Sequence, residues 1–263
     1  MSKKKNLATH VSSAAKALFS NLPVFLTVAL ILGGIDTILF HGALLINGLD
    51  ASSKELLSNQ MVLIQTSFTL LGLMMVTKAI LGPFVSILVV VYSRASVMNS
   101  SLSLGKAINF ALKRYSVVFV PYLLALLSIQ LGMIIIIPGV MFMMQYAFVD
   151  SVASLENEPH VLSRSKKLTK PRRKSLVLLI LPYVLLGQGV QFAEFIYSSE
   201  PWKLLAINAT FEASLLLLLS SFYMMYHERV TRISEKKSRR QSEPADTSEA
   251  ANGVVEAENS SSS

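Results

Sequence analysis

The sequence predicts an all-α protein, an integral membrane bundle of about six transmembrane helices with short interfacial amphipathic helices. Composition is the first reason. Only 15% of the 263 residues are charged and 52% are hydrophobic, whereas soluble domains have about 25% charged and about 45 to 50% apolar residues. The second reason is that six stretches lack dense charge, namely residues 22–46, 61–92, 117–137, 139–155, 175–196 and 204–226. Most of them reach the ~20 residues that a helix needs to cross ~30 Å of hydrocarbon.

The distribution of basic residues orients this bundle. All but three of the 24 Lys and Arg residues fall in four segments that alternate with apolar stretches. The four segments contain Lys3, Lys4, Lys5 and Lys16; Arg94, Lys106, Lys113 and Arg114; Arg164, Lys166, Lys167, Lys170, Arg172, Arg173 and Lys174; and Arg229, Arg232, Lys236, Lys237, Arg239 and Arg240. Lys54 and Lys203 occupy the opposite loops, and Lys78 lies inside the second stretch. By the positive-inside rule, both termini are expected in the cytoplasm.

The net charge of +8 indicates anionic lipid headgroups as partners. The basic residues lie beside apolar stretches and lack the interleaved aromatic residues on which nucleic-acid bases stack. Nucleic acid is therefore not expected as a partner. The chain has no cysteine, which excludes disulfides, structural thiolate clusters and thiol nucleophiles.

Two short segments have the pattern of interfacial helices. From Leu7 to Phe19, apolar residues recur at helical spacing, and residues 103–112 repeat this pattern with Ser103 as a plausible N-cap. We expect the first to lead into the first span and the second to precede the third.

Two longer stretches leave the number of crossings to be decided. A helix over residues 61–92 would be longer than the bilayer core is thick, and Gly82 and Pro83 mark a break in it. The charge pattern nevertheless favours a single crossing. Residues 117–155 suffice for two crossings joined at a helix turn formed by Pro138 and Gly139. A re-entrant hairpin would leave the same flanking residues inside. We favour two crossings, because lipid-facing irregular backbone at mid-depth is costly.

The apolar stretches define three regions of the chain. Residues 1–21 are expected to form a cytoplasmic interfacial helix and residues 22–232 the six-span domain. Beyond residue 238 the chain is polar and rich in Ser, Glu and Ala, a composition that buries too little apolar surface to fold. We therefore expect residues 233–263 to form a disordered cytoplasmic tail.

The centre of the chain, roughly residues 100–195, resembles a known family. An interfacial helix leads into a span that ends IIIIPG, followed by a span that ends FVDSVASLE, the segment HVLSRSKKLTK and a further span. This order is similar to the YciC-like integral membrane proteins and to the membrane domain fused to some bacterial glycerophosphodiester phosphodiesterases. The most specific matches are Pro138, Gly139, Glu156, Arg164, Ser165, Leu168, Thr169 and Lys170. The resemblance implies a six-span bundle in a bacterial inner (cytoplasmic) membrane. It does not imply phosphodiesterase activity, because the sequence contains no such catalytic domain.

The segment from Glu158 to Lys170 can form an amphipathic surface helix. Val161, Leu162 and Leu168 would face lipid. The candidate headgroup contacts are Arg164, Lys166, Lys167, Lys170, Arg172, Arg173 and Lys174. Glu156 would pair with Arg164 or cap this helix. The alternative is a solvated basic loop that serves only to set topology.

Ionisable residues inside spans are costly and therefore mark candidate sites. Asp36, Lys78 and Glu212 form a candidate intramembrane charge cluster, because the long lysine side chain can bridge to either carboxylate. A structural clamp is favoured over an ion relay. Asp150 and Glu194 lie nearer the ends of their spans, where water would reach them.

The sequence contains no motif of an enzyme. It has no glycine-rich phosphate loop, no nucleophile elbow and no histidine pair with metal-ligand spacing, and we expect no catalytic residue, cofactor or metal. The sequence thus favours a non-enzymatic inner-membrane protein that acts through lipids or an unknown membrane-protein partner. The alternative is a small transporter or channel subunit that uses its intramembrane charges.

Overall fold

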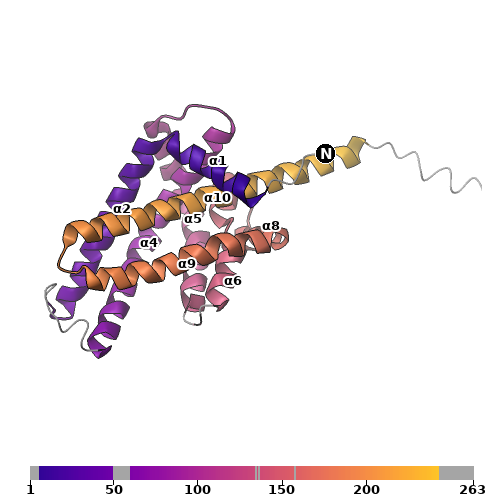
Figure 1. Ribbon diagram of the computed structural model, residues 1–263. Helices are drawn as coiled ribbons and strands as arrows, with labels where there is room; N and C mark the ends of the chain where they lie inside the picture. Colours follow the sequence, from indigo (N-terminus) through magenta and orange to yellow (C-terminus); the bar gives the residue numbers. More distant parts are fainter. Residues whose placement is uncertain (1–5, 50–59, 134, 136, 157, 243–263) are drawn as a thin grey trace, which may run out of the picture. The chain divides into compact units, whose positions relative to one another are not determined.

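The computed structural model describes residues 6–49, 60–133, 135, 137–156 and 158–242 (Figure 1). All regular elements in these residues are helices. The chain divides into two compact units, Met1–Tyr226 and His227–Ser263. Lys3, Lys4, Lys5, Lys54 and the chain beyond Ser242 lie outside the described residues, so the predictions for the loop around Lys54 and for the end of the tail stay predictions.

The prediction of a multi-span helical membrane protein is supported by five helices in the described residues that are long and apolar enough to cross a membrane. These candidate spans are Leu22–Ile46, Ile64–Val97, Leu104–Met133, Val161–Ile196 and Pro201–Arg239. The sixth expected span, residues 139–155, is divided between α6 (Ile137–Tyr146) and α7 (Val149–Leu155). Each of these two helices alone is too short to cross the hydrocarbon core.

The first two helices follow the predicted boundaries. Helix α1 (Leu7–Phe19) contacts α2 (Leu22–Ile46) and α4 (Gln60–Val97), and its buried residues are His10, Ala14 and Ala17. Pro23 stands in the first turn of α2, where its missing N–H has no intrahelical acceptor to lose. Gly48 ends α2 with φ +70°, and the Leu49 N–H donates to the Leu44 carbonyl at 3.0 Å. This left-handed cap is the position that favours glycine.

Helix α4 continues through Gly82 and Pro83, so the predicted break is not present. Neighbouring hydroxyls make hydrogen bonds on both sides of the proline. Tyr115 Oη donates to the Ile80 carbonyl at 2.8 Å, and Ser86 Oγ donates to the Pro83 carbonyl at 3.0 Å. Proline is tolerated inside a membrane helix when neighbouring side chains bond the backbone groups beside it.

Helix α5 (Leu104–Met133) is continuous, so the predicted interfacial helix at residues 103–112 is the first part of a longer helix rather than a separate element. The Ser103 carbonyl accepts the first bond of this helix, from the Ala107 N–H at 3.1 Å. Ala107 and Ala111 are fully buried. These two alanines therefore pack inside the protein, whereas Leu104 on the same apolar face is 49% exposed.

Helices α5 and α6 pack against each other, and the predicted turn at Pro138 and Gly139 is helical. Pro138 and Gly139 lie in the first turn of α6 rather than in the connection. A Cβ on Gly132 would lie 2.7 Å from the Gly139 nitrogen, and one on Gly139 would lie 2.7 Å from Met133 Cα. Pro138 thus starts a helix, and the two glycines let α5 and α6 approach closely.

Helices α6 and α7 both contact α5, and α8 (Val161–Thr169) contacts α6 and α7. The 3₁₀ turn η1 (Lys170–Arg172) leads into α9 (Arg173–Ile196). Val161 and Leu168 are buried, 7% and 2% exposed. These two residues therefore pack on protein, not on lipid as predicted, whereas Leu162 is partly exposed.

Helix α9 lies beside the first part of α10 (Pro201–Ser242), as Figure 1 shows. The rings of Tyr183 and Phe211 stack at 5.0 Å between them. Helix α10 continues to Ser242, so the described part of the predicted tail, residues 233–242, is helical. The apolar pattern ends near Tyr226, but the helix does not end with it.

Candidate functional site

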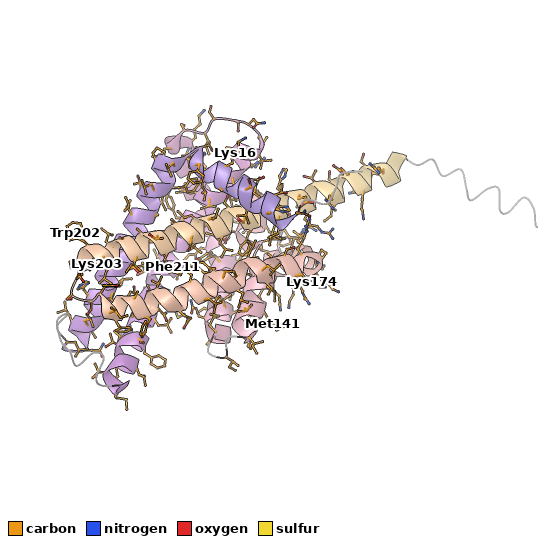
Figure 2. The ribbon with its side chains drawn as sticks, viewed as in Figure 1. Lys16, Met141, Lys174, Trp202, Lys203 and Phe211 are labelled. Atoms are coloured by element: carbon orange, nitrogen blue, oxygen red, sulfur yellow. The ribbon has the colours of Figure 1, made fainter. Side chains whose placement is uncertain are left out.

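The bundle has two distinct ends. At the first, here called the basic end, α2 begins, α4 finishes and α9 begins. The rings of Phe25 in α2 and Tyr92 in α4 meet at 5.6 Å there. At the opposite end, a buried apolar cluster includes Phe40, Phe195 and Leu204. Figure 2 shows Lys174 and the pair Trp202 and Lys203 at opposite ends of the α9–α10 pair.

Asp36, Lys78 and Glu212 come together between these ends. Asp36 lies about 21 Å of helical rise from Leu22 in α2, and Lys78 lies about 21 Å from Tyr92 in α4. Glu212 lies about 21 Å from Tyr226 in α10. Lys78 Nζ is 3.3 Å from Asp36 Oδ2 and also makes an ion pair with Glu212 Oε1. The structure therefore brings together all three residues of the predicted charge cluster, one each from α2, α4 and α10.

Close packing of α2 against α10 sets this geometry. A Cβ on Gly33 would lie 2.7 Å from the Cα of Ala209, so the two backbones touch one turn from the cluster. Asn208 Nδ2 donates to Thr37 Oγ1 at 3.2 Å across the same crossing. Asp36 follows Gly33 by three residues, and Glu212 follows Ala209 by three residues. Both carboxylates therefore lie on the Lys78 side of the crossing.

A small cavity of about 30 Å³ adjoins the cluster. Its polar lining includes Thr77 and Tyr122 as well as the three charged residues. Gly82 makes room for the tyrosine, because a Cβ there would lie 2.8 Å from Tyr122 Cε1. A buried water needs about 10 to 15 Å³ of cavity volume and two or more polar partners. The cavity therefore has space for about two waters or a small ion, and not for an organic molecule.

The cluster has unequal charge and unequal exposure. One ammonium faces two carboxylates, which leaves a formal excess of one negative charge when all three groups are ionised. The Glu212 and Asp36 side chains are 0% and 4% exposed, whereas Lys78 is 24% exposed. Glu212 Oε2 is buried without a hydrogen-bond partner. Because an unpaired buried charge is expensive, the arrangement favours uptake of one proton or small cation.

A second buried carboxylate lies nearer the opposite end. Glu194 is 1% exposed, not hydrated as its position near the end of a span suggested. The amide of Asn208 is near enough to act on this carboxylate as a hydrogen-bond donor, but no bond of standard geometry reaches either buried oxygen. Sequence reasoning missed Asn208. Its place one helical turn before Glu212 was the available signal, since residues four apart share a helix face.

Asp150 belongs to α7, which contacts both α4 and α5. Its side chain interacts with Ser86 on α4, one helical turn from Gly82. Tyr122 on α5 senses the charge of both Asp150 and Glu212. Asp150 thus lies beside α4 and α5 and is partly exposed, which agrees with its expected place near the end of a span.

The basic end has its own ion pair. Arg164 Nε lies 3.0 Å from Glu156 Oε2, as predicted, and Tyr226 Oη donates to Glu156 Oε1 at 2.8 Å. Ser165 Oγ donates to the Gln145 carbonyl at 2.9 Å and fixes α8 on α6. This network connects three helices where the chain returns to the basic end.

The seven basic residues of this region do not share one environment. Lys166, Lys167, Lys170, Arg173 and Lys174 are exposed. Arg172, by contrast, is only 7% exposed, because the η1 turn directs it inward. Arg164 is half-buried in its ion pair. Of the seven predicted headgroup contacts, only the five exposed residues are accessible at the surface.

Within the described residues, no group of three or more His, Cys, Asp or Glu side chains is arranged to hold a metal ion. Comparison of the chain with protein-family models, with curated proteins and with solved structures found no match.

Proposed function

We propose that this protein is a small membrane transporter or channel subunit, and that Asp36, Lys78 and Glu212 form its ion-binding centre. The ion is a proton or another small monovalent cation. The observation that carries the proposal is the unbalanced charge cluster beside a cavity deep in the bundle. Ionisable residues at such depth are costly, and they are characteristic of ion pathways.

Features of the cavity support a small ion over an organic substrate. Its volume of about 30 Å³ matches about two waters. Its charged lining carries a net negative charge, which attracts a cation and repels an anion. A purely structural clamp needs one ammonium and one carboxylate, and the second carboxylate has no role in it.

The test is ion flux in vesicles that contain the purified protein. A pH-sensitive dye inside reports proton entry, and a sodium-sensitive dye in parallel vesicles reports sodium entry, under an inside-negative potential. We expect entry of one ion above the rate of empty vesicles and its loss in Glu212→Gln. Glu200→Gln, the same change at an exposed residue, is the matched control. If neither ion enters faster than in empty vesicles, or if Glu212→Gln behaves as the control, the proposal is wrong.

The orientation belongs to the same proposal. We place the basic end and both termini in the cytoplasm of a bacterial inner membrane, supported by the charge pattern. Single cysteines can report this, because the chain has none of its own. Ser163→Cys in α8 should resist an impermeant thiol reagent in intact cells, and Trp202→Cys, an exposed site at the other end, should react. Labelling of Ser163→Cys would reverse the orientation.

A second role, binding of anionic lipid at the basic end, is favoured by the exposed residues of α8, η1 and α9. Juxtamembrane basic residues contribute about 1 kcal/mol each toward anionic membranes. Phosphatidylglycerol should raise the unfolding temperature of the purified protein more than phosphatidylcholine does. Replacement of Lys166, Lys167, Lys170 and Lys174 by Gln should remove that difference. An equal response to both lipids in the unaltered protein would exclude this role.

Membership of the YciC-like group is also a proposal. It is supported by the order of elements from α5 to α9 and by the Glu156–Arg164 ion pair, which joins two of the residues that carry the resemblance.

A further inference from the structure

We infer that Glu194 is a second proton-binding site, which exchanges its proton from the end of the bundle opposite the basic end and is coupled to the central cluster through Asn208. This inference rests on the proposed function, because it assigns the proton as the ion and its point of entry. It concerns a residue that takes no part in the Lys78 ion pairs.

The first argument is the isolation of the carboxylate. Glu194 is 1% exposed, and both of its carboxylate oxygens are buried without a hydrogen bond of standard geometry among the described residues. An ionised carboxylate in this situation would pay a large desolvation cost without a standard hydrogen bond to offset it. A bound proton removes the charge and supplies an O–H donor. Glu194 is therefore held in the form that carries a proton.

The second argument is the position of Asn208. Its Nδ2 donates to Thr37 Oγ1 at 3.2 Å, and its side chain also acts on Glu194. The Asn208 amide nitrogen carries two N–H groups, so one can donate to Thr37 while the other is directed at Glu194. An ionised Glu194 would accept strongly from this second N–H, whereas a protonated Glu194 would accept only weakly. The protonation state of Glu194 thereby affects the Asn208–Thr37 hydrogen bond, which joins α10 to α2.

The third argument is the direct connection to the cluster. Thr37 and Asn208 both adjoin residues of the cluster. Asp36 is the sequence neighbour of Thr37, and Glu212 follows Asn208 by one turn of α10. The charged groups that act on Glu194 are Asp36 and Lys78. Loss of the Glu194 proton would add a second uncompensated negative charge to the same region. Binding of a proton at one site therefore affects binding at the other.

Access from the opposite end follows from the place of Glu194 in α9. It lies about 3 Å of helical rise from Ile196, where the helix ends. A short connection then leads to the exposed residues Glu200 and Trp202. The cluster is much farther from this end, so a proton that enters here reaches Glu194 first.

Infrared difference spectroscopy of the purified full-length protein tests the inference without any transport assay. A protonated carboxylic acid has a carbonyl stretch separate from those of carboxylates and amides. We expect such a band at neutral pH, a shift of the band in D₂O, and its loss in Glu194→Gln. Glu200→Gln is the control and should keep the band. If the spectrum of Glu194→Gln retains every protonated-carboxyl band of the unaltered protein, the inference is wrong.

The coupling has its own readout. In Asn208→Leu, the infrared band of Glu194 should persist. Glu212→Gln is expected to change the pH-dependence of unfolding, and this change should be smaller when it is measured in the Asn208→Leu background. If Asn208→Leu leaves that change undiminished, Glu194 and the cluster bind protons independently. A Glu194 band in a protein that moves no ions would overturn the proposed function and leave the proton site in place, so the two failures are distinguishable.

Discussion

The central cluster and the basic end both contain a charged side chain that is shared by two partners, but the two regions differ in their balance of charge. At the basic end, Arg164 and Tyr226 both donate to Glu156, and all three lie where the chain leaves the bundle. In the centre, Lys78 serves two carboxylates, one of which has a buried oxygen without a partner. The first arrangement balances its charges and holds α7, α8 and α10 together. The second leaves one negative charge over, which is what an ion-binding site requires.

The largest expected effect comes from removal of the shared cation. Lys78→Met leaves two buried carboxylates unpaired, and loss of one partner from a buried pair costs about 3 to 5 kcal/mol. The unfolding temperature in detergent should fall accordingly. Lys203→Met, which removes a lysine that is 56% exposed from its own ion pair, should cost far less, because surface ion pairs contribute little to stability. Equal losses in the two variants would show that the central pair is worth no more than a surface pair.

A smaller effect is expected where α2 crosses α10. Gly33→Ala forces the two backbones apart, because the new Cβ would lie 2.7 Å from Ala209 Cα, and overpacking of this kind costs about 1 to 3 kcal/mol. Gly42→Ala is the matched control in the same helix, since nothing lies within 4 Å of its Cβ position. That change should be neutral or stabilise by up to about 1 kcal/mol. Detergent unfolding that ranks the two alanine variants the other way would exclude close packing at Gly33.

The smallest effect belongs to the basic end. Glu156→Gln removes the charge that Arg164 and Tyr226 share, in a network that is partly exposed. We expect a loss of about 1 kcal/mol or less. Added salt should reduce the difference from the unaltered protein, because exposed charges are screened. A loss as large as that of Lys78→Met would remove the contrast between the two regions.

The sequence predicted much of the fold because membrane spans depend on length and apolar composition. The bounds of α1 and α2 and the presence of one long candidate span over residues 61–92 follow from that pattern. The predicted break at Pro83 was wrong because two side chains supply hydrogen bonds beside the proline. Tyr115 is distant in sequence, and Ser86 follows the proline by three residues. The division of residues 139–155 into α6 and α7 depends on packing against α5, which periodicity does not encode.

The candidate site was predicted in part. Asp36, Lys78 and Glu212 stand out because charge inside an apolar stretch is rare. The role of Gly33 was not visible, because a glycine in a membrane helix gives no indication of which neighbour it approaches. Val161 and Leu168 were assigned to lipid for a similar reason, since an apolar face fits a bilayer and a protein core equally well.

A set of double-mutant cycles tests the central cluster most directly. Unfolding would be measured for Lys78→Met, Asp36→Asn and Glu212→Gln, and for Lys78→Met combined with each of the other two. Residues in contact show coupling of about 0.5 to 3 kcal/mol. We expect coupling of Lys78 to both carboxylates, the stronger to Glu212, which is completely buried, so that each second change recovers part of the loss caused by Lys78→Met. Strictly additive losses in both double variants would show that Lys78 is not shared between the two carboxylates and would contradict the account.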